Sequence, residues 1–157
     1  AAGYLIKIVD DVMPYKWGKL VSNLSNAIDA VTGTDWGTES AVEHAVYQEA
    51  KAILAKAGIR WISQQQVIDD WPETKNIRGQ IGTMGQSSTW QSLVRRQGSV
   101  ETDFLNGEIG RLAEKVGLKA PLNQKLIEIT RGMATRHEPP GKYTAAQLSK
   151  MLGMAEK

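Results

Sequence analysis

Apolar residues recur with a helical period along most of this 157-residue chain, and this pattern constrains its fold more than any other feature. Only two short segments, YLIKIVD at 4–10 and IRWIS at 59–63, have the composition of strands. A chain of this length can bury a core of its own, and no internal repeat divides it. The sequence therefore predicts a single all-α domain over residues 1–157.

Helix breakers and capping residues divide this pattern into separate helices. Glycines at 79, 82 and 85 predict a loop over residues 73–86. The expected helices are 14–32, ended by Gly33; a helix capped by Thr38 that ends near Gly58; a short helix after Ser63, ended by Pro72; a helix from about residue 88; a helix capped by Ser99; a helix after Pro121, with Asn123 as a candidate cap; and a last short helix after Thr144.

Composition and charge exclude several classes of protein. The absence of cysteine excludes disulfides and thiolate metal sites and is compatible with a reducing compartment, so we expect a cytoplasmic protein. The formal charge of +2 gives no basis for nucleic-acid binding, and no apolar run reaches the roughly 18 residues that span a membrane. His44 and His137 have no partners at metal-ligand spacing, so we expect no metal site.

The first expected helix contains KWGKLVSNLSNAID, and its polar side is unusual. With Lys19 at 0° on a helical wheel, Asn23 falls at about 40° and Asn26 at about −20°, opposite the apolar face. Such a stripe usually faces water, but asparagine is a poor helix former, and a local cost of this kind is expected where a site is built. An ammonium and two amides would suit a small oxygen-rich anion such as an α-keto carboxylate. Both interpretations stay open on spacing alone.

The later segment ETDFLNGEIGRLAEKVG departs from helix preferences as well. Gly107 and Gly110 each cost about 1 kcal/mol relative to alanine in a helix interior. They indicate either tight helix–helix packing or a backbone cleared for a ligand. Glu101 lies in the first turn, where the helix dipole favours a carboxylate even without a function.

Taken together, these stretches resemble the C-terminal domain of ketopantoate reductases (2-dehydropantoate 2-reductases). KWGKLVSNLSNAIDAVTG is followed downstream by SSTWQSL and GSVETDFLNGEI, and GLKAPLNQKLIEI continues the similarity. The similarity extends from about residue 10 to residue 135. It implies an all-α helical bundle like the C-terminal domain of ketopantoate reductase and of 6-phosphogluconate dehydrogenase-like proteins.

The resemblance also implies the residues of the site. The family's catalytic lysine corresponds to Lys19, which would act as general acid. Its conserved glutamate corresponds to Glu101, which would orient Lys19 or a substrate hydroxyl. Many members have a second asparagine eight residues after the lysine, where this chain has Ala27. The family's nearby asparagine corresponds to Asn23 and its substrate-binding serine to Ser88. Asn26, one position before Ala27, would bind the substrate together with them through directed hydrogen bonds.

Enzymes of this family reduce 2-dehydropantoate to pantoate with NADPH, and they pair the helical domain with an N-terminal Rossmann domain. This chain has no G-x-G-x-x-G motif after a strand, since GQIGTMG has the wrong glycine spacing. We therefore expect the NADP-binding Rossmann domain to lie outside this chain, as its partner in the parent protein. The chain alone is expected to have little or no reductase activity.

Other functions and assemblies stay open at this point. Hydroxyacid or opine-type dehydrogenases also place a lysine and an asparagine on a helix, at a different spacing. A non-catalytic helical interaction module would leave Lys19, Asn23 and Glu101 apart on a solvated surface. Dimerisation through the long helices is also left open.

Overall fold

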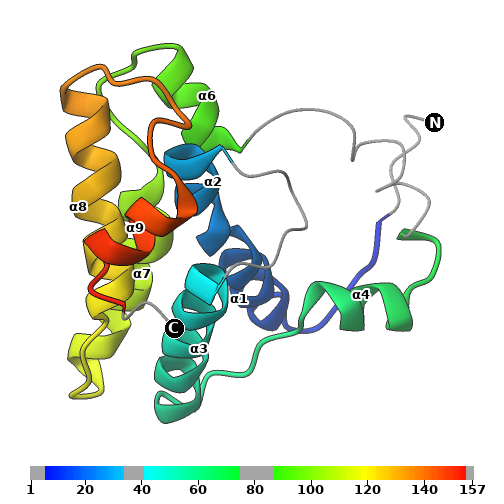
Figure 1. Ribbon diagram of the computed structural model, residues 1–157. Helices are drawn as coiled ribbons and strands as arrows, with labels where there is room; N and C mark the ends of the chain where they lie inside the picture. Colours follow the sequence, from blue (N-terminus) through cyan, green and yellow to red (C-terminus); the bar gives the residue numbers. More distant parts are fainter. Residues whose placement is uncertain (1–5, 34–40, 75–86, 155–157) are drawn as a thin grey trace.

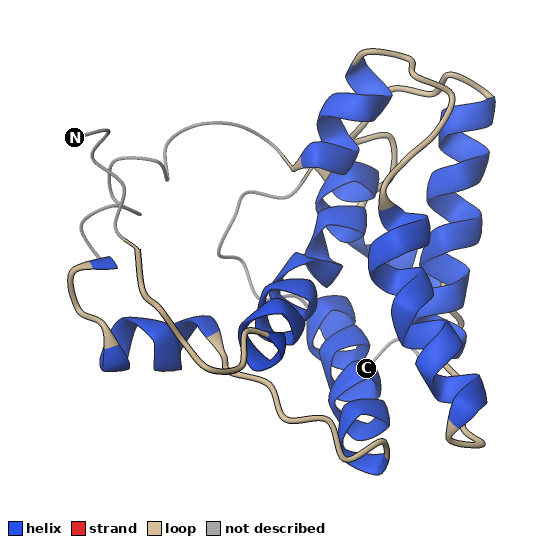
Figure 2. Cartoon of the chain, turned by 180° about the vertical axis from the view of Figure 1, so that it is seen from behind, coloured by secondary structure: helices blue, strands red, loops and turns tan. Residues whose placement is uncertain are grey.

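The computed structural model describes residues 6–33, 41–74 and 87–154 of the chain. Within these ranges every regular element is helical and no strand occurs, which confirms the all-α prediction (Figure 2). No helix in these parts of the chain is long and apolar enough to cross a bilayer. The elements are α1 (Met13–Ser22), the 3₁₀-helix η1 (Asn23–Ser25), α2 (Asn26–Thr32), α3 (Ala41–Lys56), α4 (Gln64–Asp70), α6 (Ser88–Val94), α7 (Thr102–Lys115), α8 (Pro121–Thr135) and α9 (Ala145–Met151).

The long helices α7 and α8 lie side by side and form one wall of the domain (Figure 1). α2 and α3 pack against α8, and α9 packs against both α2 and α3. α4 contacts α1 and lies to one side of the bundle. Every described helix except α4 contributes apolar side chains to the core. Its largest fully buried members are Leu24, Ile53, Leu54, Ile109, Leu126, Met133 and Leu148.

The opening helix is not continuous, so the prediction of one helix over 14–32 is wrong. It is divided into α1, η1 and α2 at Asn23–Ser25. The hydroxyls of Ser22 and Ser25 each donate to the carbonyl three residues earlier, at 2.9 and 3.3 Å. Such local bonds compete with the α-helical pattern and favour the tighter 3₁₀ geometry. Three residues at about 120° instead of about 100° each rotate α2 by roughly 60° from the path of a continuous helix.

α1 lies against the segment that leads into α4. The Ile62 N–H donates to the Pro14 carbonyl at 3.0 Å. Gly18 faces the same segment one turn later, and a Cβ at this position would collide with the Ile62 carbonyl. The glycine therefore permits the close approach that positions α1, whose last turn carries Lys19.

Several of the expected helix ends are confirmed. Ser63 and Thr144 each form a capping box with a glutamine three residues later. Gly33 follows α2 in the left-handed region, at φ 66°, as expected for a glycine that ends a helix. The cap expected at Thr38 and residues 75–86 of the expected loop lie outside the described residues.

The cap predicted at Ser99 is wrong. α7 begins at Thr102, and the residue at its N-cap, Glu101, makes no capping bond with its side chain. Val100 is buried, whereas Ser99 is exposed. The chain therefore enters the helix only after Val100 has packed into the core.

Asn123 does not cap α8, because a carboxylate from another helix takes that role. α8 begins at Pro121, and Asn123 is fully buried in its first turn. Glu49 of α3 accepts bonds from the N–H groups of Leu122 and Asn123, both at 3.0 Å, and from the Asn123 side chain at 2.8 Å. The side-chain oxygen of Asn123 accepts from Asn106 of α7 at 2.9 Å. One carboxylate at a helix N-terminus thus connects α3, α7 and α8.

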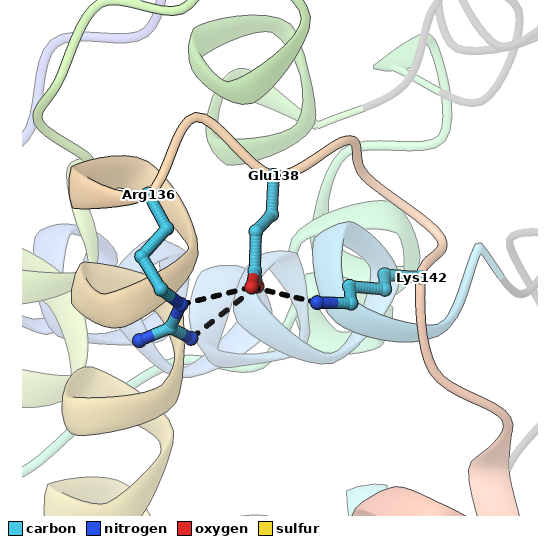
Figure 3. Close-up of polar contacts among 3 residues, drawn as sticks. All are labelled: Arg136, Glu138 and Lys142. Atoms are coloured by element: carbon cyan, nitrogen blue, oxygen red, sulfur yellow. Dashed lines mark hydrogen bonds and ion pairs between the residues drawn. The ribbon is translucent and has the colours of Figure 1, made fainter.

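A charged cluster holds the loop between α8 and α9 (Figure 3). Glu138 accepts hydrogen bonds from Arg136 Nε at 2.8 Å and from Lys142 Nζ at 2.6 Å. The hydrogen bond from Arg136, together with that from Lys142, lowers the pKa of the Glu138 carboxyl from 4.5 to about 2. The same loop donates two backbone hydrogen bonds to the last turn of α2. The cluster therefore stabilises the C-terminal segment where it crosses the end of α2.

Acid should destabilise the fold through the Glu138 carboxyl. Its folded pKa of about 2 is below the ordinary 4.5, so its contribution is present above about pH 4.5 and is lost as the pH falls towards 2. We expect the free energy of unfolding, measured by urea titration, to decrease over this window, and to decrease less in Glu138→Gln. Glu128→Gln, at a surface pair with Lys125, serves as control. Identical pH dependence in the wild type and Glu138→Gln would contradict the prediction.

Removing the Glu49 carboxylate should strongly destabilise the domain. Glu49→Ala leaves two N–H groups and a buried amide without their acceptor, and we expect a loss of about 3 kcal/mol in the free energy of unfolding. Glu114→Ala, at an exposed position on α7, should change it by less than about 0.5 kcal/mol. Urea denaturation of the two variants compares them directly, and equal effects would refute the role assigned to Glu49.

Candidate functional site

The first turn of α6 is fastened to α2 by one serine. Ser87 is the N-cap of α6, and its hydroxyl oxygen accepts from the Trp90 N–H at 3.2 Å. The same hydroxyl donates to the Asn26 carbonyl at 3.2 Å, and the Ser87 N–H donates to the Asp29 carboxylate at 3.2 Å. These bonds fix the start of α6 against the start of α2.

Ser88, the first residue of α6, contacts the residue that precedes α7. Its Oγ donates to Glu101 Oε2 at 2.6 Å. A hydroxyl–carboxylate bond of this length is charge-assisted and stronger than a bond between neutral groups. Two residues that the sequence analysis singled out, 13 positions apart in the chain, are therefore in direct contact.

The side chain of Asn26, the first residue of α2, is buried. Only 5% of the residue is exposed, and its side-chain oxygen has no hydrogen-bond partner among the described residues. A buried amide oxygen without a partner costs about 1–3 kcal/mol, so an atom of this kind needs an explanation. A continuous helix would have left Asn26 on the polar face beside Lys19, as the helical wheel predicts. In the folded domain α6 packs on this part of α2, where the Ser87 hydroxyl donates to the Asn26 carbonyl.

Lys19 and Asn23 lie where α1 ends and η1 begins. Lys19 is exposed and Asn23 is half-buried. Within residues 6–33, 41–74 and 87–154, no ion pair involves the Lys19 ammonium, and Glu101 is bonded to Ser88 and not to Lys19. η1 packs against α7, and α2 packs against α6. The elements that carry Asn23 and Asn26 therefore pack against those that follow Glu101 and carry Ser88, and α1, which carries Lys19, adjoins η1.

Three more polar side chains on α6 and α7 were missed by the sequence analysis. They are Thr89, Thr102 and Asn106, all of them buried. The hydroxyls of both threonines and the side-chain oxygen of Asn106 have no partner in the part of the chain that the structure describes. Each threonine directly follows a predicted site residue in the sequence, which is the signal that could have identified them. Unsatisfied oxygens thus occur in the first turns of α2, α6 and α7.

Close packing does not explain the two glycines inside α7. A Cβ at Gly107 would make ordinary van der Waals contacts with Arg111 and Ile127, at 3.6 and 3.8 Å. A Cβ at Gly110 would meet no described atom within 4 Å. Tight helix–helix packing is therefore not supported as the reason for these glycines. That they leave room for a ligand beside the helix backbone stays a prediction.

The polar groups of the predicted residues can donate and accept hydrogen bonds. Oxygens of Ser88, Glu101 and Asn26 can accept hydrogen bonds, and Lys19 can donate them. Within the described ranges, no group of three His, Cys, Asp or Glu side chains could hold a metal ion. The arrangement suits a small polar molecule that carries both hydroxyl groups and anionic oxygens.

Comparison with known proteins decides the kind of domain. Residues 11–134 match the family model described as ketopantoate reductase PanE/ApbA C terminal. The chain belongs to this family. The resemblance seen in the sequence motifs is thereby confirmed, and the ketopantoate reductase C-terminal domain accounts for most of the chain.

A solved ketopantoate reductase contains a region with the same fold as this domain. The protein in this crystal structure is a PanE/ApbA family ketopantoate reductase from Ralstonia eutropha. Its sequence is 27% identical to that of the present chain, and the two structures superpose with a TM-score of 0.63. The alignment covers 87% of this chain and 46% of that one, so the chain spans less than half the length of its solved relative. A comparison with curated proteins found no match.

Loss of the Ser87 hydroxyl should lower the free energy of unfolding of the domain. Ser87→Ala removes the N-cap bond and the bond to the Asn26 carbonyl, and we expect a loss of about 1–2 kcal/mol in the free energy of unfolding. Ser99→Ala, at an exposed serine outside any helix, should change it by less than about 0.5 kcal/mol. Urea denaturation provides the measurement. A Ser87→Ala protein as stable as Ser99→Ala would show that the tether between α2 and α6 contributes little.

Proposed function

We propose that this chain is the substrate-binding and catalytic half of a reductase that converts 2-dehydropantoate, or a related 2-keto acid, to the 2-hydroxy acid with NADPH. The family match over residues 11–134 is the observation that carries this proposal. The contact between Ser88 and Glu101 supports it, because two residues assigned to the site by resemblance lie within hydrogen-bond distance. We place the enzyme in the cytoplasm, in keeping with a chain without cysteine.

We propose that the dinucleotide is bound mainly outside the described residues. They contain no strand, and therefore no βαβ unit of the kind that binds a dinucleotide. NADPH would be held mainly by an N-terminal Rossmann domain of the parent protein. The roles proposed for this chain are confined to binding the keto acid and donating the proton.

Lys19 is proposed as the proton donor. Reduction of a ketone places negative charge on its oxygen, and an ammonium beside that oxygen both stabilises the charge and delivers the proton. Lys19 is exposed, so it can regain a proton from solvent after each turnover. Asn23 lies next in the chain after the last residue of α1 and is proposed to bind the same substrate.

The remaining site residues favour a substrate that carries a hydroxyl group. Ser88 donates its hydroxyl hydrogen to Glu101, so Ser88 Oγ can only accept further hydrogen bonds, through its lone pairs. The Asn26 side-chain oxygen is also an acceptor without a partner among the described residues. A hydroxyl on the keto acid would donate to these oxygens. We therefore propose that Glu101 orients the Ser88 hydroxyl and that Ser88 and Asn26 bind the substrate hydroxyl.

A related hydroxyacid or opine-type dehydrogenase is the alternative within the same broad class of enzyme. Its substrates need not carry a hydroxyl beside the keto acid. Assaying the full-length protein against 2-keto acids with and without a hydroxyl group separates these alternatives. Dimerisation through the long helices stays a prediction.

Replacing Lys19 should abolish most of the turnover. In the full-length reductase we expect Lys19→Ala to lower kcat with 2-dehydropantoate by about 10²–10⁴-fold, the usual contribution of a positioned general acid. Lys16→Ala, at an exposed lysine on the same helix, is the matched control and should keep kcat within about threefold. NADPH oxidation followed at 340 nm by the standard assay is the measurement. Turnover by the 157-residue chain alone, or a Lys19→Ala enzyme as active as the control, would refute the proposal.

A further inference from the structure

The ring of Trp90 lies where three separate segments of the chain meet. Trp90 is half-buried in the first turn of α6. A Cβ added at Gly33, which follows α2, would lie 3.4 Å from Trp90 Cη2. A Cβ added at Gly141, in the loop between α8 and α9, would lie 3.3 Å from the same atom. The edge of the indole ring therefore packs against the backbone of both glycines, at a distance that leaves little room for a side chain on either.

The loop that carries Gly141 is itself fixed to α2. The Gly141 N–H donates to the Ala30 carbonyl at 2.9 Å, and the Tyr143 N–H donates to the Val31 carbonyl at 3.1 Å. Both acceptors belong to the last turn of α2, where carbonyl groups have no partner within the helix. The family match ends at residue 134. A segment beyond the family match thus holds the ring of Trp90 against the end of α2.

α6 is held against α2 at two positions that are three residues apart. The Ser87 hydroxyl donates to the carbonyl of Asn26, the first residue of α2, at 3.2 Å. Trp90 packs against Gly33, just past the end of α2. Residues three apart lie on one face of a helix, so these two contacts together fix which face of α6 is turned toward α2. Ser88 lies between the two positions, and its direction follows from them.

We propose that Trp90, supported by the backbone of Gly141, is a positioning residue for the substrate-binding hydroxyl of Ser88. This inference rests on the proposed function, because it takes Ser88 to bind the substrate. Trp90 would act through the rotation of α6, which sets the direction of Ser88 Oγ and of its bond to Glu101. A hydrogen bond weakens steeply away from its preferred angle, so a displaced Trp90 would weaken substrate binding without changing the proton donor.

Alanine in place of Gly141 tests this role by displacing the ring. Gly141 has φ 68°, and the added Cβ would press on Trp90 Cη2. Gly117→Ala is the matched control. Gly117 has φ 72°, so alanine there meets the same backbone strain, but its Cβ would meet no described atom within 4 Å. The two variants therefore differ in the contact with Trp90, and comparing them separates this contact from a general loss of stability.

The kinetics of the full-length reductase provide the first measurement. We expect Gly141→Ala to raise KM for 2-dehydropantoate about fivefold relative to Gly117→Ala, with kcat of the two variants within about twofold. A protein that is only less stable would lose active enzyme, which lowers the apparent kcat and leaves KM unchanged. Trp90→Phe removes the ring atoms on which the added Cβ would press. Adding Gly141→Ala to Trp90→Phe should therefore raise KM no further.

Hydrogen exchange of the full-length protein, followed by mass spectrometry, reports the same contact without any substrate. We expect the amides of α6 to exchange about tenfold faster in Gly141→Ala than in Gly117→Ala, because α6 loses one of its two fixed positions on α2. The amides of α3 should be equally protected in both variants, which shows that the rest of the fold is intact.

Two results would overturn the inference. The first is an equal KM for 2-dehydropantoate in the two glycine variants, and the second is equal exchange of their α6 amides. If the full-length protein does not reduce 2-dehydropantoate, the proposed function fails, and the exchange rates alone decide whether Gly141 and Trp90 hold α6 in place. If turnover is normal and the KM values are equal, the proposed function stands and only this inference fails.

Discussion

The arrangement of the long helices depends on the carboxylate of Glu49. It accepts the N–H groups at the start of α8, and through Asn123 it is connected to Asn106 on α7. Asn106 and Asn123 are fully buried, so water cannot replace the partners they have in the fold. Glu101 lies at the N-terminal end of α7. The interaction that positions α7 against α8 therefore also decides where the carboxylate of the candidate site lies.

The 3₁₀ turn between α1 and α2 has the corresponding effect on the other side of the site. Lys19 before the turn is exposed and Asn26 after it is buried, although a continuous helix would place both on one face. One amphipathic segment thereby carries an exposed ammonium and a buried amide oxygen. Ser87 then fixes the start of α6 to Asn26 itself, which brings Ser88 to the same region. The site is assembled by short polar contacts between helix starts.

Local signals were sufficient for most of the fold. The caps at Ser63 and Thr144 could be predicted because both partners of each capping box lie within one helical turn. The predictions at Ser99 and Asn123 failed for tertiary reasons. A buried Val100 delays the start of α7, and Glu49 takes the capping role at α8. For the site, resemblance to ketopantoate reductases singled out Ser88 and Glu101. Thr89, Thr102 and Asn106 were missed: adjacency to Ser88 and Glu101 marks the two threonines as candidates, but nothing along the chain shows that any of the three is buried.

By itself the sequence determined the all-α class and the family, because helical period, capping residues and ordered motifs are all read from neighbours along the chain. Only the tertiary structure decided that Ser88 bonds to Glu101, 13 positions away, and that Glu49 caps a helix 74 positions away. It also decided that Asn26 is buried. These contacts join residues on different helices, and no pattern along the chain specifies them. They form only when packing of the apolar faces brings the helix starts within hydrogen-bond distance.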